Sequence, residues 1–262
     1  MTRLQLSRRH FLGFTGAAAS SILLSGCDAF DFVGESEDTT RRVLQKANDL
    51  TYVVQRRLQG RDALAREYSE SEIRQGQKPN GETDPETEEY VALRTRDFAN
   101  YHLQVHGLVE TPASISLEQL RNMPQRTQIT RHDCVEGWST VAKWTGVPLR
   151  QILEIVRPTA SARYVVFHCF DAVDTAKGPA LFYGSIDLID ARHPQTILAY
   201  GLNDRALPVE NGAPLRLRVE RQLGYKMSKY IKSIELVSGF ANIQGGRGGY
   251  WEDYGYDWYG GI

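Results

Sequence analysis

Beyond Tyr90 the chain is a mixture of short β-like runs and short helical stretches, and this mixture limits the folds that are open to it. The strand candidates, rich in β-branched and aromatic side chains, are residues 101–105, 164–170, 197–200, 215–219 and 230–237. Residues 149–156 have the apolar spacing of a helix, and residues 215–219 alternate strictly, as a half-buried strand should. Because no regular βαβ repeat joins these elements, the sequence predicts one compact α+β domain.

The segments on either side of this domain differ from it in composition. Residues 39–74 contain no Pro and repeat apolar side chains at helical spacing, which predicts one or two helices. Residues 76–85 are rich in Pro, Gly and polar side chains, which is typical of a loop. We therefore expect a helical appendage with a linker over 28–89, ahead of the main domain at 90–240. The Gly-, Tyr- and Trp-rich tail at 241–262 either wraps the domain, lines a cavity mouth or hangs free.

The first 27 residues resemble a targeting segment. Residues 7–12, Ser-Arg-Arg-His-Phe-Leu, precede a short apolar run, as in a twin-arginine export signal, and this run is too short to span a bilayer. The run ends in Leu-Ser-Gly-Cys27, which resembles a bacterial lipobox, and Asp28 resembles an inner-membrane retention signal. A plain signal with a stray cysteine is the alternative. The sequence predicts a periplasmic protein, anchored to the inner membrane by lipid on Cys27, and suits a chain that takes up a cofactor before export.

Charge and cysteine content exclude several functions. The 31 basic and 32 acidic side chains give a net charge of -1, so there is no global field to attract nucleic acid, and we expect no nucleic-acid partner. Three cysteines, Cys27, Cys134 and Cys169, are too few for a disulfide framework or a paired-cysteine zinc ribbon. The chain has no cysteine cluster for iron–sulfur and no Cys-x-x-Cys-His for haem. An electron-transfer function would therefore need a separate partner.

The densest group of reactive side chains surrounds Cys134, at residues 131–139. Four side chains offer a zinc site: His132, Cys134, His168 and Cys169. Adjacent strand residues point to opposite faces, however, so His168 and Cys169 cannot easily bind one metal. A Cys–His nucleophile pair and a simple buried thiol also remain open.

Two segments then carry a family resemblance. Residues 134–139 (Cys-Val-Glu-Gly-Trp-Ser) and 144–149 (Trp-Thr-Gly-Val-Pro-Leu) resemble the catalytic core of the sulfite oxidase superfamily of molybdopterin-dependent oxidoreductases. Within it the likeness is to the catalytic subunit of periplasmic methionine sulfoxide reductase. Residues 206–216 and 224–234 continue the resemblance in order. It implies a sulfite oxidase-type fold of mixed strands and short helices, holding one molybdenum and one pterin.

The resemblance also implies roles for residues near the metal. Cys134 would bind molybdenum as a thiolate, because a soft sulfur ligand suits this metal and must be deprotonated. Glu136 would relay protons if burial raises its pKa, or would only orient the loop. Cys169 would line the cofactor. The family's cofactor-binding loop is shortened here to residues 93–100, so its contacts stay unassigned.

A second group would hold the organic part of the cofactor. Asn211 and Arg216 resemble cofactor contacts, and Met227, Ser228 and Lys229 resemble a segment that holds the pterin phosphate through backbone amides and an amine. A phosphate dianion favours such a set of a guanidinium, an ammonium and free backbone donors. Taken alone, Arg216 and Lys229 would be solvated charges on the surface.

The implied reaction is a two-electron oxygen-atom transfer. S-oxide or N-oxide substrates would be reduced with electrons from a membrane haem or quinone-linked donor. Sulfite oxidation is an alternative, although Glu136 would repel a sulfite dianion. A second alternative is a lipoprotein that binds a ligand and has lost the metal. Tyr183 could donate a hydrogen bond to an oxo group, and Asp171 could contact a pterin nitrogen. His193 precedes a proline and is typical of a turn. For all three residues a structural role is favoured.

Overall fold

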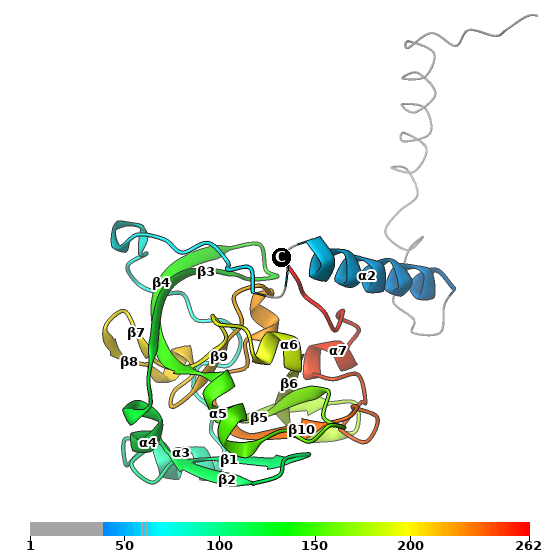
Figure 1. Ribbon diagram of the computed structural model, residues 1–262. Coiled ribbons are helices and arrows are strands. Elements are labelled where there is room, and N and C mark those ends of the chain that lie inside the picture. The colour runs from blue at the N-terminus through cyan, green and yellow to red at the C-terminus, as the bar shows by residue number, and fades with distance from the viewer. Residues whose placement is uncertain (1–38, 59, 61) are drawn as a thin grey trace, which may run out of the picture. The chain divides into compact units, whose positions relative to one another are not determined.

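The structure, a computed structural model, describes residues 39–58, 60 and 62–262 (Figure 1). The predicted export signal and lipobox at 1–27 lie outside the described residues. The chain divides into two compact units, residues 1–50 and residues 51–262. Within the described part, no helix is both long and apolar enough to cross a membrane.

Two five-stranded sheets form the second unit. The first has the order β2 (Ala113–Ser116), β1 (His102–Gly107), β10 (Ile231–Val237), β5 (Tyr164–Thr175) and β6 (Gly178–Asp187). In this sheet β1 and β10 run parallel, and the other neighbours are antiparallel. The second joins β3 (Arg126–Asp133), β4 (Ser139–Pro148), β7 (Ile197–Leu202) and β8 (Arg205–Ala206), and β9 (Arg216–Arg218) also pairs with β7. This mixed architecture is the α+β fold predicted from the sequence.

Short helices connect the strands and cover the sheets. The α-helices are α3 (Glu88–Arg94), α4 (Leu117–Asn122), α5 (Leu149–Val156), α6 (Leu188–Ala191) and α7 (Tyr250–Asp253). The 3-10 helices are η2 (Glu70–Glu72), η3 (Val209–Asn211) and η4 (Gly224–Lys226). Helix α5 has the predicted bounds, because four of its five apolar residues recur at positions 1, 4, 5 and 8 and are buried, while Ile155 is exposed. It ends at Arg157, which adopts a left-handed conformation.

The predicted helical appendage is one helix, and the second possible helix is not formed. Helix α2 spans Thr39–Leu58. The chain from residue 62 to residue 68 is instead irregular, and its backbone bonds to the second sheet: Tyr68 N–H donates to Ile129 O at 2.9 Å and Arg74 N–H to Val141 O at 3.1 Å. Hydrogen bonds to a sheet edge satisfy the same groups that a helix would use, so helical spacing alone was misleading here.

Buried ion pairs hold the last turns of α2 against the domain. Arg56 donates to both oxygens of Asp190, at 2.7 and 2.6 Å, and to Asp187 at 3.1 Å. The Tyr52 hydroxyl donates to the same Asp187 carboxylate at 2.8 Å. Residues 51–58 are therefore part of the domain surface.

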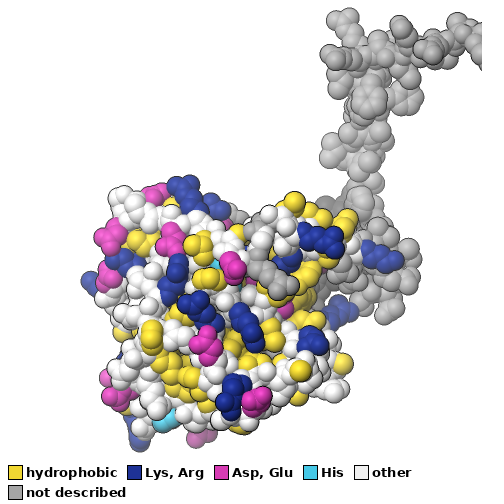
Figure 2. All heavy atoms as spheres, viewed as in Figure 1, with side chains coloured by type: hydrophobic (Ala, Val, Ile, Leu, Met, Phe, Trp, Pro, Cys, Tyr) yellow, Lys and Arg dark blue, Asp and Glu magenta, His cyan; other side chains and the backbone are white. Residues whose placement is uncertain are grey.

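The aromatic tail packs on the domain, which is one of the arrangements that the sequence left open. Lys226 forms an ion pair with Glu252, and both side chains are buried. Trp258 Nε1 donates to Ser185 Oγ at 2.9 Å. On the face in Figure 2, basic and acidic side chains are interspersed over the described part. That face therefore presents no extended patch of a single charge.

Candidate functional site

The Cys134 thiol lies at the tip of the β3–β4 hairpin. Asp133 and Ser139 are the last paired residues, so residues 134–138 form the connecting loop. Cys134 N–H donates to Trp138 O at 2.9 Å, and Gly137 N–H donates back to Cys134 O at 3.0 Å. Gly137 has a φ of +83°, a conformation that favours glycine. The hairpin thus presents a half-buried free thiol on a fixed turn.

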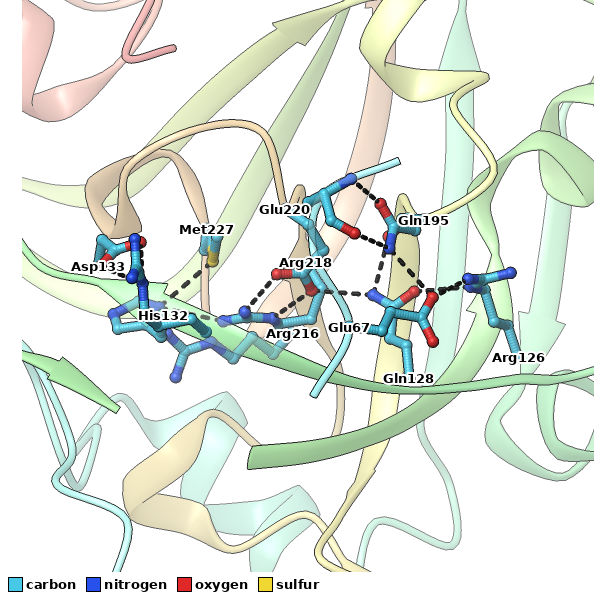
Figure 3. A network of polar contacts seen from close by, with 12 residues as sticks. Glu67, Arg126, Gln128, His132, Asp133, Gln195, Arg216, Arg218, Glu220 and Met227 are labelled. Carbon is cyan, nitrogen blue, oxygen red and sulfur yellow. Dashed lines mark hydrogen bonds and ion pairs between the residues drawn. The ribbon is translucent and has the colours of Figure 1, made fainter. Parts of the chain in front are cut away.

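His132 connects this hairpin to the interior. Its Nδ1 lies 3.0 Å from Arg218 Nη1 and 3.3 Å from Met227 Sδ (Figure 3). Its ring centroid is 5.6 Å from that of Trp138. Burial, followed by the positive charges of Arg216, Arg218 and Lys229, holds the pKa of His132 well below its usual value. The imidazole is therefore neutral, with Nδ1 as the acceptor from Arg218.

The predicted half-buried strand at 215–219 is fully buried, and its arginines face inward. Arg216 and Arg218 are 2% and 0% exposed, and their guanidinium carbons lie 5.2 and 4.4 Å from the centroid of the Trp144 ring. Arg218 also makes a two-pronged ion pair with Glu220, at 2.9 and 2.7 Å. The strict alternation correctly predicted which side chains share a face of the strand. It wrongly predicted that the polar face is exposed to solvent, because that face points to the interior of the protein.

Arg216 and Lys229 lie side by side in this interior. Leu217 N–H donates to Ser228 O at 2.8 Å, which joins β9 to the segment that holds Lys229. Gly212 separates the two side chains, since a Cβ there would lie 3.0 Å from Lys229 Cβ and 3.3 Å from Arg216 Cβ. Burial and the neighbouring Arg218 lower the pKa of Arg216 to about 9. Burial and the charge of Arg216 lower the pKa of Lys229 to about 7.

These two cations are a candidate anion site. Glu220 neutralises Arg218, whereas neither Arg216 nor Lys229 forms an ion pair with any carboxylate of the described residues. Arg216 Nε is buried and has no hydrogen-bond partner. A phosphate or another dianion would satisfy both charges, because guanidinium and ammonium donors bind such groups strongly. The surface charges expected for Arg216 and Lys229 without the family motif are therefore excluded.

The next layer of the site contains Cys169, Ser228 and Asp171. Cys169 is fully buried on β5, and burial holds the pKa of its thiol well above the usual value. Asp171, two residues along the same strand, is 6% exposed, and its Oδ1 has no hydrogen-bond partner. Burial raises the Asp171 pKa to about 7, although the nearby Lys229 acts in the opposite direction. Buried polar atoms without partners are expected where a bound group completes the site.

Glu136 lies on the exposed side of the hairpin. Its side chain is 58% exposed and accepts a hydrogen bond from Trp138 Nε1 at 2.8 Å. The Lys78 ammonium is 4.0 Å from the carboxylate and 4.9 Å from the centroid of the Trp138 ring. A proton-relay role for Glu136 depends on burial, and the side chain is not buried. Glu136 therefore provides contacts that orient the loop.

Several other candidates lie away from this site. His168 Nε2 is 2.8 Å from Glu235, and within the described residues no cluster of His, Cys, Asp and Glu is arranged to hold a metal. Tyr183 donates to Asp253 at 2.6 Å, and His193 Nε2 lies 3.0 Å from Ala63 O. These contacts are structural.

Two further residues at the site could not be predicted from the sequence. Arg216 Nη2 donates to Asn80 Oδ1 at 3.0 Å, and Lys229 Nζ donates to the Glu82 carbonyl. Both partners come from the linker at 76–85, where composition predicts only a loop. Arg218, by contrast, was detectable: it is two residues from Arg216 on one strand and so shares its face.

Anion binding to the site is expected to weaken as pH rises. An anion favours protonated Lys229, whose pKa is about 7, so its proton is lost above pH 7. Asp171, also with a pKa of about 7, gains negative charge over the same range, which acts in the same direction. Sulfate affinity should fall up to about tenfold per pH unit between pH 7 and 9. Calorimetric titration of the cofactor-free chain with sulfate measures the affinity at each pH, and an affinity that does not change with pH would contradict the prediction. In Lys229→Met the sulfate affinity should be low and should depend less steeply on pH.

Comparisons with known proteins identify a family and several relatives of this chain. A family model described as the oxidoreductase molybdopterin binding domain matches residues 90–241. The chain is 36% identical over 255 residues to an Azospira oryzae protein whose name gives it as a candidate protein-methionine-sulfoxide reductase subunit, YedZ1; the match covers 97% of this chain and 88% of that protein. A chain of the sulfane dehydrogenase SoxCD from Paracoccus pantotrophus matches with a TM-score of 0.47 and 22% identity, over 53% of this chain and 39% of that one.

Other relatives are longer proteins. The catalytic subunit MsrP of protein-methionine-sulfoxide reductase from Xanthomonas campestris is 39% identical over 160 residues, which is 58% of this chain and 49% of that protein. The Campylobacter jejuni MsrP is 36% identical over 148 residues, 53% of this chain and 49% of that protein. The chain thus spans about half of each MsrP. The matched domain contains every cofactor residue named from the sequence, and this chain belongs to the oxidoreductase molybdopterin-binding domain family.

Proposed function

We propose that this oxidoreductase carries one molybdenum and one pterin and reduces S-oxide or N-oxide substrates by two-electron oxygen-atom transfer. The observation that carries the proposal is the pair of buried cations, Arg216 and Lys229, which have no carboxylate partners among the described residues; Arg216 also interacts electrostatically with the free Cys134 thiol. The names of the relatives, protein-methionine-sulfoxide reductase subunits, favour an S-oxide.

The residues present fit such a cofactor. Arg216 Nε offers a free buried donor and Asp171 Oδ1 a free buried acceptor, which suits a group with an anionic end and N–H donors. Arg216 and Lys229 would bind the phosphate together with the backbone amide of Ser228, whereas Met227 N–H donates to Gly224 O at 3.0 Å. When bound, the group supplies a redox centre that exchanges an oxygen atom and two electrons with the substrate. Cys134 would hold the metal, and Cys169 and Asn211 would line the cofactor.

The chain's own residues fix the geometry and the charge around the metal ligand. The hairpin hydrogen bonds between Cys134 and the Gly137–Trp138 segment fix the backbone of the cysteine, and the neutral His132 ring packs against Trp138. Glu136 places a negative charge at the exposed side of the loop, which favours a neutral S-oxide over a sulfite dianion.

The reaction needs a separate electron donor. Reduction of R₂SO to R₂S and water consumes two electrons and two protons. The sequence has no haem or iron–sulfur motif, so we propose that a membrane haem or quinone-linked protein delivers the electrons. The twin-arginine pattern and the lipobox support export to the periplasm and lipid attachment at Cys27, which would keep the enzyme close to such a donor.

Metal analysis and a substrate panel test this proposal. Protein from a host that makes the cofactor should contain close to one molybdenum per chain and should oxidise reduced viologen dye with methionine sulfoxide or an N-oxide. Sulfite-dependent cytochrome c reduction that survives Glu136→Gln, without sulfoxide turnover, would support the oxidative alternative instead. Absence of molybdenum and pterin would leave the binding lipoprotein as the function.

A further inference from the structure

The last turns of α2 bind the domain through their polar side chains. Tyr52 and Arg56 are one helical turn apart, so they lie on the same face of the helix. Tyr52 donates to Asp187 at 2.8 Å, and Arg56 donates to the same carboxylate and to Asp190. These hydrogen bonds and ion pairs fix the rotation of the last turns about the helix axis.

The opposite side of these turns is apolar and exposed to solvent. Val54 and Leu58 lie about 200° round the helix from the residues that bind the domain, because each is two positions further along. Their exposed fractions are 42% and 81%, and that of Val53 is 41%. In the sequence, Leu50 continues this spacing four positions before Val54, and it is 63% exposed. We call Val53, Val54 and Leu58 the outer face.

The outer face reverses the usual orientation of an amphipathic helix. A helix on the surface of a globular protein normally turns its apolar stripe towards the core and its polar side chains towards water. Here the polar side chains contact the domain, and the apolar stripe is exposed. An exposed apolar stripe of this kind marks a surface that binds a membrane or another protein.

Two features of the sequence indicate that the outer face binds a membrane. Apart from the paired Arg56, α2 carries four basic residues and one acidic residue, and such a charge beside an apolar stripe is typical of helices that lie on anionic bilayers. In addition, only the 11 residues 28–38 separate the predicted lipid site, Cys27, from the start of α2. Fully extended, that many residues reach at most about 40 Å. A lipid on Cys27 would therefore keep the helix close to a bilayer.

From these observations we infer that α2 is an interfacial helix that binds the surface of an anionic phospholipid membrane. The outer face enters the boundary between headgroups and acyl chains, and the opposite face stays on the domain. This contact adds a second attachment to the lipid proposed at Cys27 and determines which side of the domain meets the bilayer. It involves no residue assigned to the metal or to the cofactor, so it goes beyond the proposed reaction.

Vesicle binding by the full chain with Cys27→Ser tests the helix without the lipid anchor. This chain should bind vesicles of phosphatidylcholine with phosphatidylglycerol more strongly than vesicles of phosphatidylcholine alone. Val54→Gln combined with Leu58→Gln should lower the partition constant at least about tenfold, because burial of one such side chain contributes about that factor. Arg57→Gln should weaken binding only to the vesicles that contain phosphatidylglycerol. Ile155→Gln is the matched control, since Ile155 is a 45% exposed apolar residue of α5, and it should leave binding unchanged.

Hydrogen exchange locates the contact on the chain, and the first 26 residues are the same in every variant. Exchange in residues 51–58 should slow when vesicles with phosphatidylglycerol are added, whereas exchange in residues 149–156 of α5 should not change. Equal partition constants with and without the double substitution, or unchanged exchange in residues 51–58, would overturn the interfacial helix. Slower exchange there at higher protein concentration without vesicles would also overturn it, because a second copy of the chain would then cover the outer face.

The same double variant separates this inference from the proposed function. Its molybdenum content and its sulfoxide turnover in solution should equal those of the parent, because the outer face lies outside the cofactor site. Loss of vesicle binding with full turnover is the expected result. Full metal content and turnover without any vesicle binding by the parent would overturn the interfacial helix and leave the proposed function intact.

Discussion

Cys134→Ser should lower sulfoxide turnover by at least about 100-fold, because loss of even an outer-shell partner of a metal ligand costs 10- to 100-fold. A serine hydroxyl is a harder ligand and stays protonated at neutral pH, so it cannot replace the thiolate. The pterin should remain bound, since Arg216 and Lys229 are unchanged. The melting temperature should also stay within about a degree, because Cys134 is half-buried in a loop and serine has a similar volume.

Turnover with a viologen donor, pterin content and the visible absorption of the thiolate–metal bond measure this outcome. Cys169→Ser is the matched control. It changes the buried cysteine of β5, so it should preserve the thiolate absorption while weakening cofactor retention. Cys134→Ser with full turnover would exclude Cys134 as the metal ligand.

Glu252→Gln should destabilise the domain strongly, because it leaves Lys226 charged and buried without its carboxylate. The two side chains are 4% and 1% exposed. Removal of one partner of a buried pair costs about 3–5 kcal/mol. For a domain of this size that corresponds to a fall in melting temperature of about 10 °C. Glu252 lies in α7 and Lys226 in η4, so the loss should also loosen the tail.

Thermal unfolding followed by circular dichroism, with proteolysis of the tail, measures this effect. Glu110→Gln is the control, since its pair with Arg157 is 58% and 64% exposed and is expected to contribute less than about 1 kcal/mol. The double change Lys226→Met with Glu252→Gln should recover part of the stability. Equal melting temperatures for Glu252→Gln and Glu110→Gln would show that the buried pair does not hold the tail.

Local patterns predicted much of the fold correctly. The predicted helix at 149–156 has the bounds of α5, and the run at 164–170 lies within β5. The short motif at Cys134 correctly predicted the family. It could do so because the residues of the tight turn that presents the thiol are adjacent in the sequence. The pattern left the number of helices in 39–74 open, and one helix forms because the backbone at Tyr68 and Arg74 hydrogen-bonds to the second sheet.

The sequence by itself determined the family, and through it predicted Cys134 as the metal ligand and the residue types of the candidate anion site. Only the tertiary structure decided that Arg216 faces the interior and that Asn80, 136 positions away, binds it. Periodicity reports which residues share a face of a strand, but it does not report whether water or another segment covers that face. Burial, and with it the lowered pKa of Lys229, arises from contacts between distant segments, and no local pattern records those contacts.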